Sequence, residues 1–189
     1  TSVEETWKNV QNAISPRLLI SVPVSTVQME YICHRKAPKM LELITDLVSA
    51  AAGHCDNVEF AAEDATRADH SFLCDAINTA ISHGAKTITI CDTAGTMMPE
   101  EFISFLETLY QDIPALATVT LAVRTCDELG MAVASAFACV RAGVMQIDVA
   151  ASGSPCAALD AVAHVFHNRG DSIGIFCGLD MTSLNRAMK

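Results

Sequence analysis

Residues 87–99 read TITICDTAGTMMP, and this stretch decides the fold. The β-branched residues at 87–91 predict a buried strand, a glycine-containing turn follows, and Pro99 suits the first turn of a helix that extends to about residue 110. The same order of strand, short turn and helix recurs along the chain. It predicts parallel strands that are joined by helical crossovers.

Nine further segments complete this alternation. Strands are predicted at 18–24, 57–61, 119–123 and 145–149, and helices at 3–13, 38–52, 69–83, 129–142 and 157–168. The strands are almost continuously apolar, which is typical of a parallel sheet with both faces covered. The last twenty residues show no clear period.

Two α/β architectures fit five such units. One is an open, doubly wound sheet, which needs no missing parts. The other is the last five units of a (β/α)8 barrel, which would remain unclosed because about 250 residues are typical of that fold. Both architectures place functional groups at the carboxyl ends of the strands.

Composition narrows the class of function. The 189 residues are 51% hydrophobic, and 12 Lys and Arg against 22 Asp and Glu give a net charge of −10. The chain has no basic stripe and only one Trp, which argues against nucleic-acid binding. No apolar run reaches the roughly 18 to 20 residues of a membrane span, and Thr1 does not begin a signal peptide. Eight scattered cysteines without a C-x-x-C pair predict a reduced, cytoplasmic protein.

Polar residues follow the predicted strands where a site is expected. Ser25, Glu63, Asp92, Thr93 and Arg124 are the candidates. Carboxylates and hydroxyls can bind or protonate a substrate, and a guanidinium can hold a carboxylate or phosphate through two hydrogen bonds.

Each candidate also has a structural interpretation. Asp64, beside Glu63, could cap the next helix, and the pair 92–93 could form a buried turn network. Arg124 could form an internal salt bridge to Glu63, Asp92 or Asp127. The sequence alone leaves these alternatives open.

Several strand ends, taken together, resemble one enzyme family. The matching stretches are 25–31, 58–67, 90–102, 127–134 and 178–182. They resemble 2-isopropylmalate synthase and homocitrate synthase, metal-dependent acyltransferase barrels that are related to hydroxymethylglutaryl-CoA lyase. The resemblance implies a partial (β/α)8 barrel that contains strands four to eight. Residues 1–175 would form this domain, and residues 176–189 a C-terminal tail or the start of a linker.

The resemblance implies a Claisen condensation of acetyl-CoA with a 2-oxo acid. In that reaction a divalent metal polarises the keto group as a Lewis acid. Carried over to this chain, Glu63 and Thr93 match catalytic positions, and Arg124, Asp92 and Ser25 are assigned to substrate binding.

The family's metal motif is altered in this chain. Arg124 and Cys126 stand where the resemblance places two metal-binding histidines, and Leu19 stands where another histidine is usual. The glycine-rich loop of the family is shortened to residues 153–156. A guanidinium repels a metal ion, so no metal and no other cofactor is assigned. Cys126 is interpreted either as a buried packing thiol or as a nucleophile that Arg124 activates.

Three functions remain open on this basis. The chain could be one part of a split acyltransferase, a pseudoenzyme that scaffolds or regulates an active relative, or a module that binds an organic acid. Exposed edges of a parallel sheet invite association, so a homo- or hetero-oligomer is predicted in each case. Neither a nucleic acid nor a membrane is expected as a partner.

Overall fold

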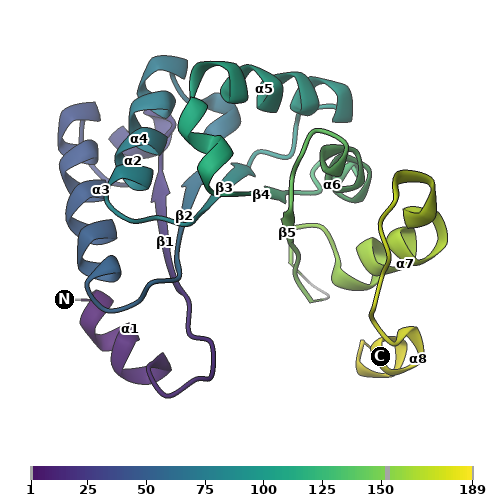
Figure 1. Cartoon of the computed structure of the whole chain (residues 1–189). Coiled ribbons are helices and arrows are strands. Elements are labelled where there is room, and N and C mark those ends of the chain that lie inside the picture. Colours follow the sequence, from purple (N-terminus) through teal and green to yellow (C-terminus); the bar gives the residue numbers. More distant parts are fainter. Residues whose placement is uncertain (1, 152–153, 189) are drawn as a thin grey trace.

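The computed structural model describes residues 2–151 and 154–188, which form a curved, parallel five-stranded sheet with helices on its outer side (Figure 1). The strands pair in chain order, so β1 and β5 form the two edges of the described sheet. Their bounds are β1 (Leu18–Pro23), β2 (Val58–Glu63), β3 (Thr87–Asp92), β4 (Thr120–Thr125) and β5 (Gln146–Asp148). All five predicted strands are confirmed.

The helices alternate with the strands as predicted. They are α1 (Ser2–Val10), α2 (Thr26–Tyr31), α3 (Ala37–Ala52), α4 (His70–Ser82), α5 (Pro99–Asp112), α6 (Ala132–Val140), α7 (Leu159–Arg169) and α8 (Met181–Ala187), with 3-10 turns at Ala65–Arg67, Pro114–Thr118 and Gly170–Ile173. Helices α2 and α8 were not predicted, because six or seven residues are too few to show a helical period. Helix α6 begins three residues later than predicted, because Gly130 adopts a φ of +72° in the preceding turn.

The outer face of the sheet carries the main hydrophobic core. Phe60 on β2, Ile88 and Ile90 on β3 and Val123 on β4 are fully buried in one cluster with side chains of the surrounding helices. These residues alternate along their strands, as a pleated sheet requires. Their burial explains why the helices pack on this side.

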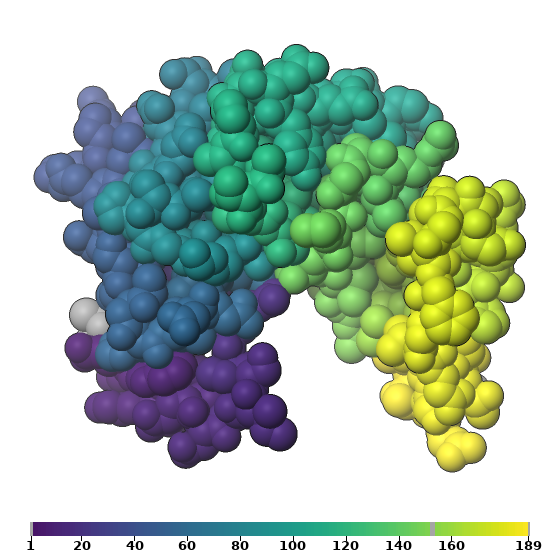
Figure 2. All heavy atoms as spheres, in the orientation of Figure 1, coloured from purple at the N-terminus to yellow at the C-terminus, as the bar shows by residue number. Residues whose placement is uncertain are grey.

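The inner, concave face is built differently. The intervening positions include Glu59, Glu63, Thr89 and Arg124, whose side chains hydrogen-bond to one another or to their neighbours on this face. The prediction of two covered faces is wrong at β1, because Ser21 is exposed here and the neighbouring Leu19 is 48% exposed. The space-filling view shows a hollow on this side, between the N-terminal segments in purple and the C-terminal segments in yellow (Figure 2).

The C-terminal part packs as a smaller, second cluster. Phe137 of α6 and Phe166 of α7 are in tilted ring contact, with centroids 5.3 Å apart. Helix α8 lies against α7, where the side chains of His164 and Asn185 are 3.0 Å apart. The predicted boundary at residue 175 stays a prediction. None of the helices in the described part of the chain is long and apolar enough to cross a membrane.

Candidate functional site

A three-residue ion cluster occupies the inner face near the carboxyl ends of the strands. The Arg124 guanidinium of β4 donates one hydrogen bond to Glu63 Oε1 of β2 at 2.6 Å and another to Asp148 Oδ2 of β5 at 3.0 Å. The three side chains are 21–22% exposed. The structure confirms Glu63 as a salt-bridge partner of Arg124, and it adds Asp148, which was not predicted.

The sheet register explains how Arg124 reaches two strands at once. Arg124 is paired with Asp148 on one side and with Cys91 of β3 on the other. Because Cys91 is small and fully buried, the arginine side chain extends across β3 to Glu63. Burial, which alone would lower the pKa of Arg124, is outweighed by neighbouring charges that include Glu63 and Asp148, so this pKa is raised.

Two hydroxyl groups complete the surroundings of Glu63. Ser21 Oγ donates to Glu63 Oε1 at 2.7 Å, and Thr93 Oγ1 donates to Glu63 Oε2 at 3.0 Å. Thr93 Oγ1 also accepts from the backbone N–H of Asp64 at 2.8 Å. The structure therefore brings the predicted residues Glu63, Thr93 and Arg124 together.

A second, deeper polar layer lies on the same face, nearer the amino ends of the strands. Arg17 donates to Glu59 Oε2 and to Gln146 Oε1, each at 2.7 Å, and Thr89 donates to Glu59 Oε1 at 2.7 Å. Gln146 joins the two layers, because its amide donates to Glu59 and, at 2.9 Å, to Asp148. Burial would raise the pKa of Glu59, but hydrogen bonds from Thr89, Gln146 and Arg17 outweigh it, so the pKa is lowered.

Ser25 and Asp92 serve local structure instead of joining this network. Ser25 is fully buried and caps α2 by accepting from the Gln28 N–H at 3.2 Å. Asp92 accepts from Thr66 Oγ1 at 2.9 Å and from the Met97 N–H at 3.3 Å, which holds the turn after β3. These contacts match the structural interpretation, and the predicted binding roles of both residues stay predictions.

Asp64 does not cap a helix through its side chain. It is fully buried in the left-handed backbone region, at φ 61°, and its carboxylate accepts two hydrogen bonds from Arg67 at 2.7 and 2.8 Å. The pair fixes the turn after β2. Glu63 alone of this acidic pair faces the inner network.

Cys126 lies just beyond Arg124, and its thiol is 3.7 Å from the thiol of Cys156. Burial, together with a hydrogen bond to Cys156, raises the pKa of Cys126 to about 12. Activation by Arg124 would lower this pKa. The raised pKa matches the interpretation of Cys126 as a buried packing thiol, and activation by Arg124 stays a prediction.

The side chains at this position do not fit a divalent metal. Glu63 and Asp148 direct carboxylate oxygens at Arg124, whose fixed positive charge stands where a cation would bind. Within residues 2–151 and 154–188, no three His, Cys, Asp or Glu side chains form a group that could hold a metal ion.

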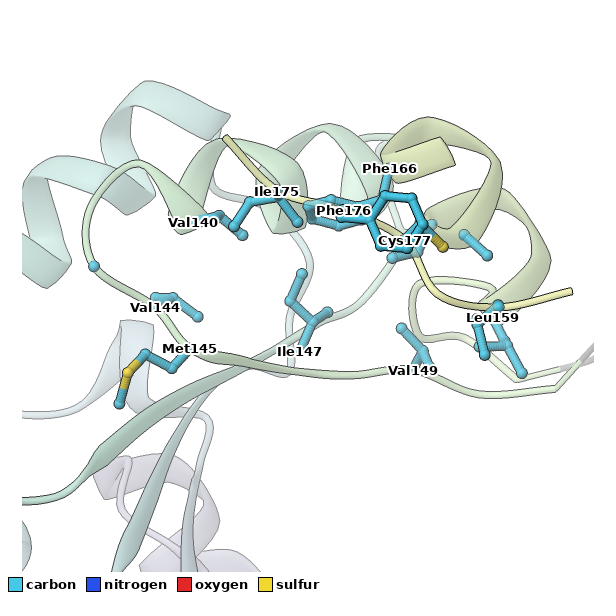
Figure 3. Close-up of a pocket in the computed structure, with 14 residues that line it drawn as sticks. Val140, Val144, Met145, Ile147, Val149, Leu159, Phe166, Ile175, Phe176 and Cys177 are labelled. Atoms are coloured by element: carbon cyan, nitrogen blue, oxygen red, sulfur yellow. The ribbon is translucent and has the colours of Figure 1, made fainter. Parts of the chain in front are cut away.

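An apolar cavity of about 720 Å³ lies on the other face of β5 (Figure 3). Ile147 of β5 and Val149, which directly follows the strand, line it together with Phe166 of α7 and with Phe176 and Cys177 of the segment after α7. Ile147 and Val149 alternate with Gln146 and Asp148, so the cavity is separated from the polar network by the sheet itself. None of the predicted site residues lines it.

The fold and the site together define a class: a segment of a parallel β/α barrel with a polar site on its inner face. The family model described as HMGL-like matches residues 1–188, and the chain belongs to this family. It is 30% identical to the 2-isopropylmalate synthase of Pelotomaculum thermopropionicum, over 99% of this chain and 38% of that protein. It is 35% identical to the 2-isopropylmalate synthase of Aquifex aeolicus, over 92% of this chain and 34% of that protein.

Solved structures support the same fold. The hydroxymethylglutaryl-CoA lyase from Pseudomonas aeruginosa superposes with a TM-score of 0.76 at 17% identity, over 90% of this chain and 60% of that one. The carboxyl transferase domain of Rhizobium etli pyruvate carboxylase, crystallised with pyruvate, gives 0.64 at 18% identity, over 90% of this chain and 28% of that one. The chain thus spans little more than a third of the length of the curated relatives named above, and its α/β fold is that of a partial barrel.

Sequence reasoning missed the residues of the deeper layer and one member of the ion cluster. These are Arg17, Glu59, Thr89, Gln146 and Asp148. The sequence did contain a sign of these buried charges. Glu59 and Asp148 are each the single charged residue inside a predicted apolar strand, and a charged side chain is rarely buried there without a partner. The sequence could not show which partners they have.

Proposed function

We propose that this domain does not carry out the metal-dependent condensation by itself and acts as a non-catalytic partner of an active relative. One observation carries the proposal: Arg124 forms ion pairs with both Glu63 and Asp148. The resemblance places a metal-binding histidine at position 124. A fixed guanidinium there changes what the site can do.

The chemistry of the site supports this proposal. A metal ion polarises a keto group because it keeps open coordination positions for the substrate. Arg124 directs hydrogen bonds to two carboxylates, at 2.6 and 3.0 Å, so its charge is already paired within the domain. Glu63 is held by Arg124, Ser21 and Thr93. The cluster is therefore a satisfied structural network.

The shape of the sheet supports a role in association. Edge strands present backbone N–H and C=O groups that other segments can pair with, and β1 and β5 are the edges of the described sheet. A parallel barrel closes only when every strand has two neighbours. We propose that further β/α segments, from the same polypeptide or from another subunit, cover these edges in a homo- or hetero-oligomer.

A CoA-release assay tests the catalytic half of the proposal. The chain is incubated with acetyl-CoA and a panel of 2-oxo acids, with Mg²⁺, Mn²⁺ or Zn²⁺ or with chelator, and metal binding is followed by calorimetry. We expect no metal-dependent release of CoA and no stoichiometric metal binding. Metal-dependent release that Arg124→Met changes would overturn the proposal.

Thermal denaturation with the same 2-oxo acids tests the third function. A 2-oxo acid that raises the melting temperature without metal, and no longer does so in Arg124→Met, would identify an organic-acid binding module. Arg141→Met is the matched control, because Arg141 is an exposed arginine of the same chain. Under our proposal neither variant changes the response to 2-oxo acids.

Native mass spectrometry of the protein purified from its source tests the partner half. We expect a stoichiometric complex with a relative that carries the metal-binding histidines. A stable monomer at micromolar concentration would contradict this half of the proposal.

A further inference from the structure

Cys126 and Cys156 face each other across a short antiparallel contact at the rim of the site. Their sulfur atoms are 3.7 Å apart, and the two residues form an isolated β-bridge. Two backbone hydrogen bonds flank them: Asp127 N–H donates to Pro155 O at 2.7 Å, and Ala157 N–H donates to Thr125 O at 2.9 Å. The bridge joins the end of β4 to the segment that precedes α7.

The hydrogen-bond pattern identifies the type of pair. Because the bonds are made by the residues before and after each cysteine, Cys126 and Cys156 form a non-hydrogen-bonded antiparallel pair. The Cα atoms of such pairs are about 4.5 Å apart, at the short end of the range of about 4.4–6.8 Å found in disulfides. Rotation of the two side chains can therefore bring the sulfur atoms to the bonded distance of about 2.05 Å.

The backbone on the β4 side is held firmly. Cys126 N–H donates to Asp92 O at 3.2 Å, and a methyl group at Gly95 would lie 2.6 Å from the Cys126 carbonyl oxygen. This close packing fixes the position of one partner. Bond formation then requires movement of side chains and little of the chain.

Both thiols are within reach of a small reagent. Each is half-buried, and the neighbouring residues Asp127, Ser154 and Pro155 are exposed. Either thiol can be the donor in their 3.7 Å contact. We assign Cys156 as the first nucleophile because Ser154 and Pro155, which lie just before it, are exposed.

We propose that Cys126 and Cys156 form a reversible disulfide, a redox modification site at the carboxyl ends of β4 and β5. Glutathione disulfide is a sufficient oxidant. The Cys156 thiolate attacks one of its sulfur atoms and glutathione thiolate leaves; Cys126 then attacks the Cys156 sulfur, loses its proton and releases the second glutathione. The protein loses two hydrogens, and one glutathione disulfide becomes two glutathione molecules.

The bond would constrain a defined part of the fold. It would close a loop over residues 126–156, which includes α6 and β5. Closing a loop of this length restricts the unfolded chain, and for a domain of this size the melting temperature should rise by on the order of 10 °C. The disulfide would thus stabilise one end of the sheet under oxidising conditions. This inference does not depend on the proposed function.

The test is a redox titration of the whole chain in glutathione buffers of increasing disulfide content, with free thiols then alkylated and mapped by mass spectrometry. Trypsin cleavage after Arg124 and Arg141 places Cys126 and Cys156 in different peptides, so a linked peptide pair reports the bond. Cys139 shares the peptide of Cys126, and fragment ions must place the link at Cys126. We expect loss of two thiols, full reversal by dithiothreitol and the rise in melting temperature.

Three serine variants make the result specific. Cys126→Ser and Cys156→Ser should each abolish the linked peptide and the thermal shift, whereas Cys177→Ser, at another half-buried cysteine, should keep both. Should either serine variant fold poorly, alkylation of the wild type with and without oxidation decides the question alone. Two thiols that stay free in glutathione disulfide, or a bond that involves other cysteines, would overturn the proposal.

Discussion

The outer and inner faces of one sheet differ in chemistry although they alternate along the same strands. On β2, Phe60 points outward and is fully buried under helices, while Glu59 and Glu63 point inward into a charged network. The outer face is stabilised by removal of apolar surface from water, which is non-directional. The inner face depends on hydrogen bonds with fixed partners and distances.

The two faces therefore respond differently to substitution. An apolar face tolerates exchange of one hydrophobic side chain for another of similar volume. In a polar face, one substitution changes what every neighbour can bind. Arg124 is such a residue, because it forms ion pairs with both Glu63 and Asp148.

The largest expected effect tests the outer face. Phe60→Ala should lower the free energy of unfolding by about 3–5 kcal/mol, because it leaves a cavity among fully buried side chains. Leu19→Ala on the open part of the inner face is the control, and it should change stability by no more than about 1 kcal/mol because Leu19 is 48% exposed. Urea denaturation measures both, and equal effects would break the comparison between the faces.

The rim where the faces meet gives the second prediction. Gly95→Ala should destabilise by about 2–4 kcal/mol, because Gly95 has a φ of +62° and its new methyl group would lie 2.6 Å from the Cys126 carbonyl oxygen. Gly130→Ala carries the same backbone strain, at φ +72°, with open space around it, so about 1–2 kcal/mol is expected. Thermal denaturation that ranks Gly130→Ala as the worse variant would contradict the close packing at the rim.

Removing the central cation of the inner face is the third test. Breaking a fully buried ion pair costs about 3–5 kcal/mol, and partial exposure reduces this, so Arg124→Met should cost about 1–3 kcal/mol. Arg141→Met should lie within about 0.5 kcal/mol of wild type. If Arg124→Met proves neutral or stabilising in chemical denaturation, the ion cluster contributes no net stability to the domain.

The smallest expected effect is a change in pH dependence. The pKa of Glu59 is lowered from its ordinary value of 4.5, so its contribution to stability is fully present above that value and is lost as the pH falls through the lower folded-state pKa. In Glu59→Gln the melting temperature should therefore fall less steeply than in wild type below about pH 5. Parallel curves for the two proteins would show that Glu59 is not stabilised in its charged form.

Much of the fold could be predicted because it rests on local patterns. Strand 87–91 and the helix that starts at Pro99 are both present, and Asp69 caps α4 by accepting from the Phe72 N–H at 2.9 Å. The short helices α2 and α8 could not be predicted from period, since neither contains two full turns. Where prediction succeeded, the deciding contacts lie within a few residues in sequence.

The site could be predicted only in part. Glu63, Thr93 and Arg124 lie together as their strand-end positions suggested, whereas Ser25 and Asp92 hold turns. Strand-end residues can either face the barrel interior or cap the following turn, and one residue of register decides between the two.

The sequence by itself determined the alternation of strands and helices, the family, and the arginine and cysteine at positions 124 and 126. Hydrophobic period and residue identity carry that information directly. Only the tertiary structure decided that Arg124 pairs with Glu63 and Asp148, and that the Cys126 and Cys156 thiols lie 3.7 Å apart. These partners are 24 to 61 residues apart in sequence, and the sheet register that brings them together is a property of the packed strands.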